Sequence, residues 1–332
     1  MKNDANLFAH RFLIIAGTSK AGTTSVFSYL ASHPQICAAE KETRFFLDAD
    51  YPLSSKTRYQ KDGPETYLSL FDSGSPEKWR LEATPDYLYS ANTPYFIRQT
   101  LTDVRLVFIL REPISRLLSW YRFARKRGVI PHDMTFDDYV RMQRDNSTRF
   151  PRERGHPAFY ALEHGRYSVY LRTYLKLFGE SSVRISFYED LRRGELEFIV
   201  PMCRWLGIDE GYFRDFKFDV INKGSDVRSP YLHKAYIESS GHVRYLLRHT
   251  PNLLRRLLRQ IRPRVDAIYA KLNVAESKEL RMSAATKEFL LLYYRDEPTR
   301  LREMLGVEVP WLSNPPAAST ELEINLSEHR AG

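Results

Sequence analysis

The chain has 332 residues, 43% of them hydrophobic, which is enough to bury the core of one large α/β domain or two modest ones. Its formal net charge of +9 suits an anionic ligand or surface but does not name one. Two cysteines, Cys37 and Cys203, exclude a disulfide framework, and no apolar stretch is long enough for a membrane span or a signal sequence. We therefore expect a globular protein in a reducing compartment, by default the cytoplasm.

Strands and helices alternate along the chain. A continuous apolar run at 12–16 predicts a strand buried on both faces, followed by a Gly/Ser/Thr loop and a helix at 25–32. Further strands are expected at 35–38, 79–83, 105–110 and 183–188. Further helices are expected at 113–127, 135–145 (with Thr135 as its cap), 164–178, 193–206, 229–249, 252–272 and 284–305.

This alternation indicates a P-loop-like three-layer α/β fold with a central parallel sheet and a helical C-terminal lobe. We predict a single domain over residues 1–313. Residues 314–332 are rich in Pro, Ala, Ser and Glu, which predicts a flexible tail.

The loop between the first strand and its helix reads GTSKAGTT from Gly17 to Thr24. A loop in this position can aim backbone amides and a helix N-terminus at an anion, while glycines allow close approach and hydroxyls add donors. It is similar to a Walker A element, but Thr23 replaces the lysine and the cation has moved to Lys20. A tight strand–helix turn with incidental threonines is the alternative, and the context favours an anion site.

A second cationic element follows the strand at 105–110. Arg111 lies at the carboxyl end of that strand, where open α/β sheets bind ligands, and Arg116 and Ser119 share a face of the next helix. Guanidinium and hydroxyl groups together suit a phosphate. The strand ends without the aspartate that holds magnesium in nucleoside triphosphatases, so the pattern favours an anion met directly by cations. A salt bridge from Arg111 to Glu112 and an ordinary helix serine at Ser119 are the alternatives.

Together the two elements resemble the signatures of sulfotransferases that use 3′-phosphoadenosine-5′-phosphosulfate (PAPS) and release the bisphosphate PAP. The heparan sulfate and bacterial carbohydrate-type enzymes are the most similar, over about 12–311, with weak agreement between 225 and 280. The resemblance implies that the 5′-phosphosulfate is bound by Lys20, Ala21, Gly22, Thr23, Thr24 and Ser25. It implies that the 3′-phosphate is held by Arg111 and Ser119, and that a late loop with Lys223 and Arg228 closes over the nucleotide.

The segment KETRFF from Lys41 to Phe46 resembles the part of these enzymes that supplies the catalytic glutamate. The resemblance implies that Glu42 takes the acceptor's proton, with Lys20 as its catalytic partner at the leaving group. Judged on residue types alone, a solvated acid in a run of charges is the better interpretation of Glu42. Arg44 stands where the family often has histidine, and we expect it to bind an anionic acceptor or to pair with Asp48.

The segment EATPDY from Glu82 to Tyr87 resembles the strand end E-K-T-P-x-Y of the family, with Ala83 in place of a lysine that contacts glycan in heparan enzymes. For Glu82, contact with the substrate and hydrogen bonding at the strand end are about equally good interpretations. The candidate acceptor contacts are Arg44, Asp48, Glu82, Asp86 and Tyr87. The expected partner is a sulfate acceptor, such as a carbohydrate, glycolipid or small metabolite with a hydroxyl or amine.

Residues 239–265 contain seven arginines and no acidic residue. Packed amphipathic helices with a solvated arginine face are the better interpretation of this basic segment. Contact with an anionic membrane surface, which would place the protein peripherally at a membrane, is the alternative. No nucleic-acid reader motif and no metal-ligand spacing is present, so we expect neither nucleic acid nor metal.

Two other functions compete with sulfuryl transfer. A P-loop small-molecule kinase would turn over ATP with magnesium, and the missing Walker lysine and aspartate argue against it. A non-catalytic nucleotide- or membrane-binding protein would bind PAP or liposomes without transfer. The joint presence of Lys20 and Glu42 argues against that function.

Overall fold

Five parallel strands form the central sheet of the computed structural model, in the order β2-β3-β1-β4-β5. The structure describes residues 10–71, 78–145, 156–218 and 282–313, together with the backbone of 226–227 and 274–275. The strands of the sheet are β1 (Arg11–Gly17), β2 (Ile36–Ala38), β3 (Trp79–Ala83), β4 (Asp103–Leu110) and β5 (Val183–Phe187). The predicted parallel sheet is confirmed. A separate antiparallel pair joins β6 (Asp226–Val227) and β7 (Val274–Ala275).

Twelve α-helices lie in the described residues, and seven of them lie mostly or wholly within ranges predicted as helical. Helix α7 begins at the predicted cap Thr135, whose hydroxyl accepts a hydrogen bond from the amide of Asp138 at 3.1 Å. The helices are α2 (Thr23–Ser32), α3 (Tyr59–Asp62), α4 (Glu65–Leu68), α5 (Thr93–Thr100), α6 (Pro113–Lys126), α7 (Phe136–Arg144), α8 (Tyr167–Phe178), α9 (Tyr188–Arg193), α10 (Glu195–Leu206), α13 (Ala284–Tyr294), α14 (Glu297–Leu305) and α15 (Pro310–Ser313).

The prediction of one helix over 284–305 is wrong, because the chain breaks between α13 and α14. Pro298 lacks an amide hydrogen, and its ring would clash with the carbonyl of Tyr294 in a continuous helix. Pro298 is instead tolerated in the first turn of α14. The helices α3, α4, α5, α9 and α15 were not predicted. The helices expected at 229–249 and 252–272 and the tail at 314–332 lie outside the described residues.

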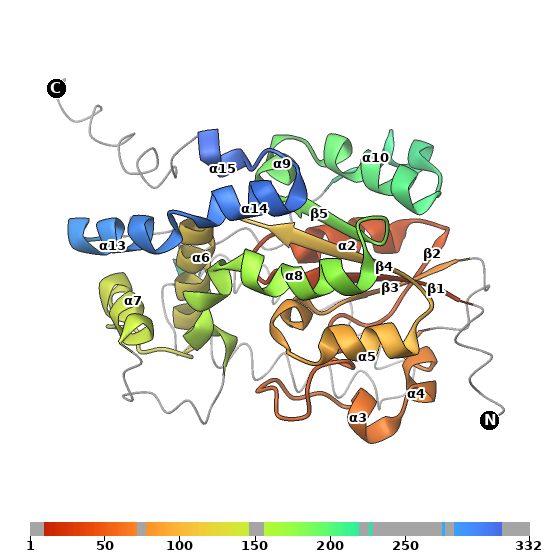
Figure 1. Ribbon diagram of the computed structural model, residues 1–332, viewed down its shortest axis with the longest axis horizontal. Coiled ribbons are helices and arrows are strands. Elements are labelled where there is room, and N and C mark those ends of the chain that lie inside the picture. The colour runs from red at the N-terminus through yellow and green to blue at the C-terminus, as the bar shows by residue number, and fades with distance from the viewer. Residues whose placement is uncertain are drawn as a thin grey trace.

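Both faces of the sheet are buried. In β1, Phe12 and Ile14 join one hydrophobic cluster and Leu13 and Ile15 join a second, and all four side chains are fully buried. Figure 1 shows α2, α9 and α10 on one side of the sheet and α5, α8 and α14 on the other. Burial on two sides explains why this strand is a continuous apolar run rather than an alternating one.

A third hydrophobic cluster joins α6, α7 and α13, to which they contribute Leu117, Tyr139 and Leu290. Figure 1 places these three helices beyond the carboxyl end of the β4 arrow. Leu301 of α14 instead belongs to the cluster that contains Phe12 and Ile14 of β1. The C-terminal helices α13 and α14 therefore pack in two different clusters.

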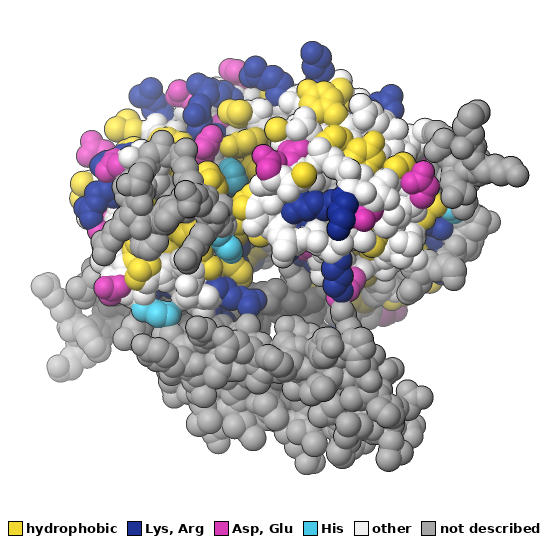
Figure 2. Space-filling view, turned by 90° about the horizontal axis from the view of Figure 1, so that it is seen from below, with side chains coloured by type: hydrophobic (Ala, Val, Ile, Leu, Met, Phe, Trp, Pro, Cys, Tyr) yellow, Lys and Arg dark blue, Asp and Glu magenta, His cyan; other side chains and the backbone are white. Residues whose placement is uncertain are grey.

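The described surface gives no sign of a membrane span. None of the helices in the described ranges is both long enough and apolar enough to cross a bilayer. On the face shown in Figure 2, basic, acidic and hydrophobic side chains are interspersed over the described part of the surface.

The strand order places four loops side by side. Because parallel strands all end at one edge of the sheet, the residues that follow β2, β3, β1 and β4 are neighbours in that order. These residues are the segment at Glu42, the segment at Asp86, the loop at Lys20 and the turn at Arg111. Every predicted catalytic or nucleotide-binding residue within the described ranges lies at or just beyond this edge.

Gly22 precedes α2 with φ of +80°, a left-handed conformation that disfavours other residues. A Cβ added there would lie 2.8 Å from Leu191 and 3.0 Å from Tyr188, both in α9. Gly128 has φ of +66°, and an added Cβ would meet nothing there. A substitution at Gly128 would therefore cost only backbone strain.

We expect Gly128→Ala to lower the free energy of unfolding by about 1–2 kcal/mol through backbone strain. Gly22→Ala should cost about 1–3 kcal/mol more, because it also overpacks against α9. Urea denaturation of the two variants measures the difference. Equal costs would contradict the close packing of α9 on the loop.

Candidate active site

The N-terminal end of α2 is open to an anion. The first carbonyl in the helix to accept is that of Gly22, from the amides of Ser25 at 3.0 Å and Val26 at 3.2 Å. The amides of Thr23 and Thr24 therefore have no acceptor within the helix, and no side chain caps this end. The first turn contains no acidic residue either. This helix end can bind an anion through backbone amides and the helix dipole.

Lys20 lies in the loop with φ of +74°, and its ammonium is 4.3 Å from the centroid of the Phe123 ring in α6. Burial, with smaller contributions from the positive charges of Arg111, Arg127, Lys126 and Lys41, lowers the pKa of Lys20 to about 8. A lysine held among other cations is stabilised by a bound anion.

Lys41 was not predicted as a site residue, although it belongs to the segment that carries Glu42. Its ammonium donates to the hydroxyl of Thr24 in α2 at 2.7 Å. Burial lowers the pKa of Lys41 to about 8 as well. Lys41 therefore adds a second half-buried cation at the open N-terminal end of α2, and only the contact between two separate segments reveals it.

The turn after β4 presents the side chain of Arg111 next to the loop at Lys20. Arg111 donates to the carbonyl of Lys20 at 3.2 Å and stacks over the ring of Tyr188 at 4.6 Å. The predicted alternative of an Arg111–Glu112 salt bridge does not form. The carboxylate of Glu112 instead caps α6 by accepting from the amides of Ile114 at 2.9 Å and Ser115 at 2.6 Å.

Ser119 is half-buried on α6, one turn before Phe123. Residues four apart share a helix face, so Ser119 lies on the face that meets Lys20. Arg116, which was paired with Ser119 in the sequence, is fully buried and donates to the carbonyl of Ala161 at 2.9 Å. Arg111 and Ser119, rather than Arg116, are therefore accessible to a ligand.

Glu42 is paired with Arg44. The Nε and Nη2 atoms of Arg44 lie 3.2 and 3.1 Å from Oε2 of Glu42, and both side chains are about one-quarter exposed, at 30% and 26%. Within the described residues, Oε1 of Glu42 accepts no hydrogen bond. The ion pair therefore orients the carboxylate and leaves one oxygen available to a substrate proton.

The predicted pairing of Arg44 with Asp48 is wrong. The Oδ2 atom of Asp48 accepts from the hydroxyl of Ser90 at 2.8 Å and from the amide of Asn92 at 3.2 Å. Asp48 is buried beside the start of α5, and these bonds from the β3–α5 connection hold its carboxylate.

Asp86 lies between the loop and the segment of Glu42. Its two oxygens accept from the hydroxyls of Tyr51 at 3.0 Å and Ser19 at 3.4 Å. Burial, with a smaller contribution from the charge of Glu42, raises the pKa of Asp86 to about 6. Two carboxyl groups thus influence each other at this point of the site, with Arg44 close to both.

Glu82 and Tyr87 lie beneath the site and are completely buried. The Glu82 carboxylate accepts from the hydroxyls of Tyr67 at 2.9 Å, Tyr87 at 3.0 Å and Thr84 at 3.2 Å, and also from Thr43. Burial raises the pKa of Glu82 to about 7. Since Thr43 precedes Arg44 in the chain, this network supports the backbone that carries Glu42 and Arg44.

Some predicted features lie elsewhere. Lys223, Arg228 and the basic segment 239–265 lie outside the described residues. Within the described ranges, no group of three His, Cys, Asp or Glu side chains gathers as a metal site would require.

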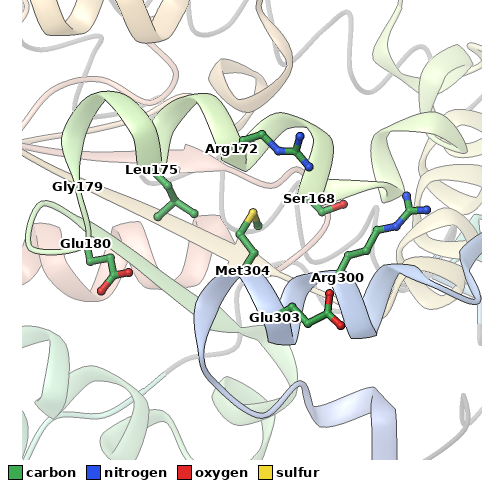
Figure 3. A pocket seen from close by; sticks show the side chains of 8 residues that line it. All are labelled: Ser168, Arg172, Leu175, Gly179, Glu180, Arg300, Glu303 and Met304. Atoms are coloured by element: carbon green, nitrogen blue, oxygen red, sulfur yellow. The ribbon is translucent and has the colours of Figure 1, made fainter.

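A cavity of about 570 Å³ lies between α8 and α14 (Figure 3), and its lining side chains Arg172, Met304 and Arg300 come from these two helices. This cavity shares no residue with the loop or with α6.

The sequence was then compared with known proteins. A family profile described as "Sulfotransferase domain" matches residues 11–245. The "membrane-associated sulfotransferase kil1" of Dictyostelium discoideum is 31% identical over 139 residues, which are 40% of this chain and 28% of that protein. The "bifunctional heparan sulfate N-deacetylase/N-sulfotransferase 1" of Caenorhabditis briggsae is 24% identical over 291 residues, 81% of this chain and 30% of that protein. The chain thus spans less than a third of the length of these relatives.

The solved structure of a sulfotransferase from Alicyclobacillus acidocaldarius superposes with a TM-score of 0.62 at 19% identity. The match covers 90% of this chain and 97% of that one, and it confirms the P-loop-like fold. The family profile matches well over half of the chain, and its span includes the loop at Lys20, Glu42, Arg111 and Ser119. The chain belongs to the sulfotransferase domain family.

Proposed function

We propose that the chain transfers a sulfuryl group from PAPS to a hydroxyl or amine of an acceptor and releases PAP. The observation that carries this proposal is the set of cations around the open N-terminal end of α2, where the half-buried Lys20 and Lys41 lie near Arg111. Membership of the sulfotransferase domain family supports the same reaction.

The chemistry of these residues fits a nucleotide with phosphate groups at both ends. The uncapped N-terminal end of α2 offers backbone amides. Lys20 lies near other cations, which together with burial lower its pKa. Arg111 and Ser119 offer a guanidinium and a hydroxyl from the next strand end. Amides and cations in two adjacent groups suit a doubly phosphorylated adenosine better than they suit a magnesium nucleotide.

Each residue has a role in the proposed reaction. Lys20 neutralises the charge that develops on the oxygen of the 5′-phosphate as its bond to sulfur breaks, and the amides and hydroxyls of Thr23 and Thr24 bind that phosphate. Glu42 accepts the proton that the acceptor loses when its oxygen or nitrogen bonds to sulfur. Arg111 and Ser119 hold the 3′-phosphate, so that the sulfuryl group is positioned for in-line attack.

The acceptor approaches from the side of Arg44 and Asp86. Both side chains lie next to Glu42, and His156 lies close enough to Arg44 for that charge to lower its pKa in addition to burial. The guanidinium and the imidazole provide directional contacts to hydroxyl groups, and the buried Asp86 carboxylate acts on them through its charge. We propose a carbohydrate, glycolipid or small hydroxylated metabolite as acceptor, supported by the heparan sulfate enzymes among the relatives. Glu82 and Tyr87 act as positioning residues beneath it.

Replacing Glu42 by Gln removes the proton acceptor without changing the size of the side chain. We expect transfer to fall by about 10²–10⁴-fold, which is the usual contribution of a general base. The dissociation constant for PAP should stay nearly unchanged, because Glu42 lies on the acceptor side. The measurement is transfer of label from PAPS to whichever glycan, glycolipid or hydroxylated metabolite the wild-type protein labels, together with calorimetry of PAP binding.

Glu40→Gln is the matched control, since it removes a neighbouring exposed carboxylate from the same run of charges. It should transfer like the wild type. Full activity in Glu42→Gln would remove the assigned base. A wild-type chain that ignores PAP but takes up ATP with magnesium would instead overturn the proposed function.

PAP affinity should depend on pH through the two half-buried lysines. In the free protein, Lys20 and Lys41 have pKa values of about 8, and a bound anion raises both because it stabilises the ammonium form. The complex therefore holds more protons than the free protein above pH 8, so affinity falls as pH rises through this range. Calorimetry in buffers of different ionisation enthalpy should show net proton uptake at pH 8.5. Lys20→Arg should reduce that uptake, and equal affinity at pH 7 and pH 9.5 would contradict the assignment.

A further inference from the structure

Arg116 is an arginine in the second anion element that no ligand can reach. Its side chain is completely buried in α6, and among the described residues it forms no ion pair. The Nη2 atom donates to the carbonyl of Ala161 at 2.9 Å, while Nε and Nη1 have no hydrogen-bond partner among these residues. A buried charge without an acidic partner is costly, so its position calls for an explanation.

The rings of two tyrosines face the guanidinium. The Cζ atom of Arg116 lies 6.0 Å from the ring centroid of Tyr89 and 5.7 Å from that of Tyr167. Tyr167 is fully buried and Tyr89 is half-buried, and the attraction of a cation to an aromatic ring increases where water is excluded. Arg116 therefore sits at a junction between a residue that follows β3 and a residue that begins α8.

Each tyrosine hydroxyl forms a hydrogen bond to a different one of the two proposed phosphate-binding elements. The hydroxyl of Tyr89 is hydrogen-bonded to the side chain of Thr18 in the first loop, and it donates to the carbonyl of His164 at 3.0 Å. The hydroxyl of Tyr167 donates to the carbonyl of Arg111 at 2.7 Å. Thr18 is two residues before Lys20, so one tyrosine anchors the 5′-phosphate loop and the other anchors the 3′-phosphate turn.

The segment between α7 and α8 completes the connection. The ring of His164 stacks on that of Tyr89 with centroids 3.7 Å apart, and Arg116 holds the same segment through Ala161. The two elements are also joined directly, because Thr18 donates its amide to the carbonyl of Ile109 at 3.0 Å. Backbone contacts thus align the strand ends, and the side chains around Arg116 fix the parts that would touch a ligand.

We propose that Arg116 is a positioning residue that fixes the distance between the two phosphate-binding elements through Tyr89 and Tyr167. The inference rests on the proposed function, since it assumes that one ligand bridges both elements. Its consequence is specific: Arg116 makes the two phosphates of PAP bind cooperatively, while it contributes little to the binding of either phosphate alone. A ligand that uses one element at a time does not sense their spacing.

The test compares four ligands: adenosine, adenosine 5′-monophosphate, adenosine 3′-monophosphate and PAP. Their dissociation constants are measured for the wild type, Arg116→Met, Tyr89→Phe and Tyr167→Phe. In Arg116→Met we expect the constant for PAP to rise by about tenfold or more, within the usual range of coupling between sites, while both monophosphates change by less than about threefold. The tyrosine variants, which keep the ring and lose one hydroxyl, should show the same selective loss to a smaller degree.

Tyr174→Phe is the matched control, because Tyr174 is fully buried and donates to the carbonyl of Tyr87 at 2.6 Å without contact to Arg116, the loop at Lys20 or the turn at Arg111. It should bind all four ligands like the wild type. Equal loss for PAP and the monophosphates, or no loss in any of the three variants, would overturn the role of Arg116. If Arg116→Met does not fold, the two tyrosine variants alone decide the question by the same criterion. A wild-type chain that does not bind PAP would instead overturn the proposed function.

Discussion

The convergence of partly buried cations on one helix end is the constraint on which this site depends. Lys20 and Lys41 converge on the N-terminal end of α2, and Arg111 lies beside them in the turn after β4. Without a ligand, the loss of water around the two lysines opposes folding and the repulsion at Lys20 adds to that cost, so the surrounding structure must hold them in place. The apolar cores of β1 and β4 provide that support, since their side chains pack on both faces of the sheet. A bound anion relieves the repulsion, which links ligand affinity directly to the stability of the sheet.

The order of the strands also arranges the chemistry. Since β3 lies between β2 and β1, the buried carboxylate of Asp86 lies between the segment of Glu42 and the loop at Lys20, and Lys41 of the same segment reaches the helix behind that loop through its bond to Thr24. Tyr51 and Ser19 bond to the same side chain, Asp86, so the acceptor side and the loop share a partner.

Much of this arrangement could be predicted from the sequence, and the rest depends on contacts between distant residues. The five strands, the loop at Lys20 and the turn at Arg111 are local patterns, because a doubly buried strand is a continuous apolar run. The bond of Lys41 to Thr24 joins residues from different elements, so no local pattern reveals it. The ion pair of Arg44 with Glu42, in place of Asp48, depends on the bonds that Ser90 and Asn92 give to Asp48. Whether the arginine of a helix points inward, as Arg116 does, is likewise decided by the packing around it.

The ends of α2 and α6 differ in a way that matters for redesign. Glu112 occupies the amides at the start of α6, whereas the start of α2 has no side-chain cap. One end of a nucleotide would therefore be recognised in part by main chain, which substitution leaves in place, and the other by the side chains of Arg111 and Ser119, which substitution removes. Donor preference at the ribose could accordingly be re-engineered from α6 while the main-chain donors at the start of α2 stay in place.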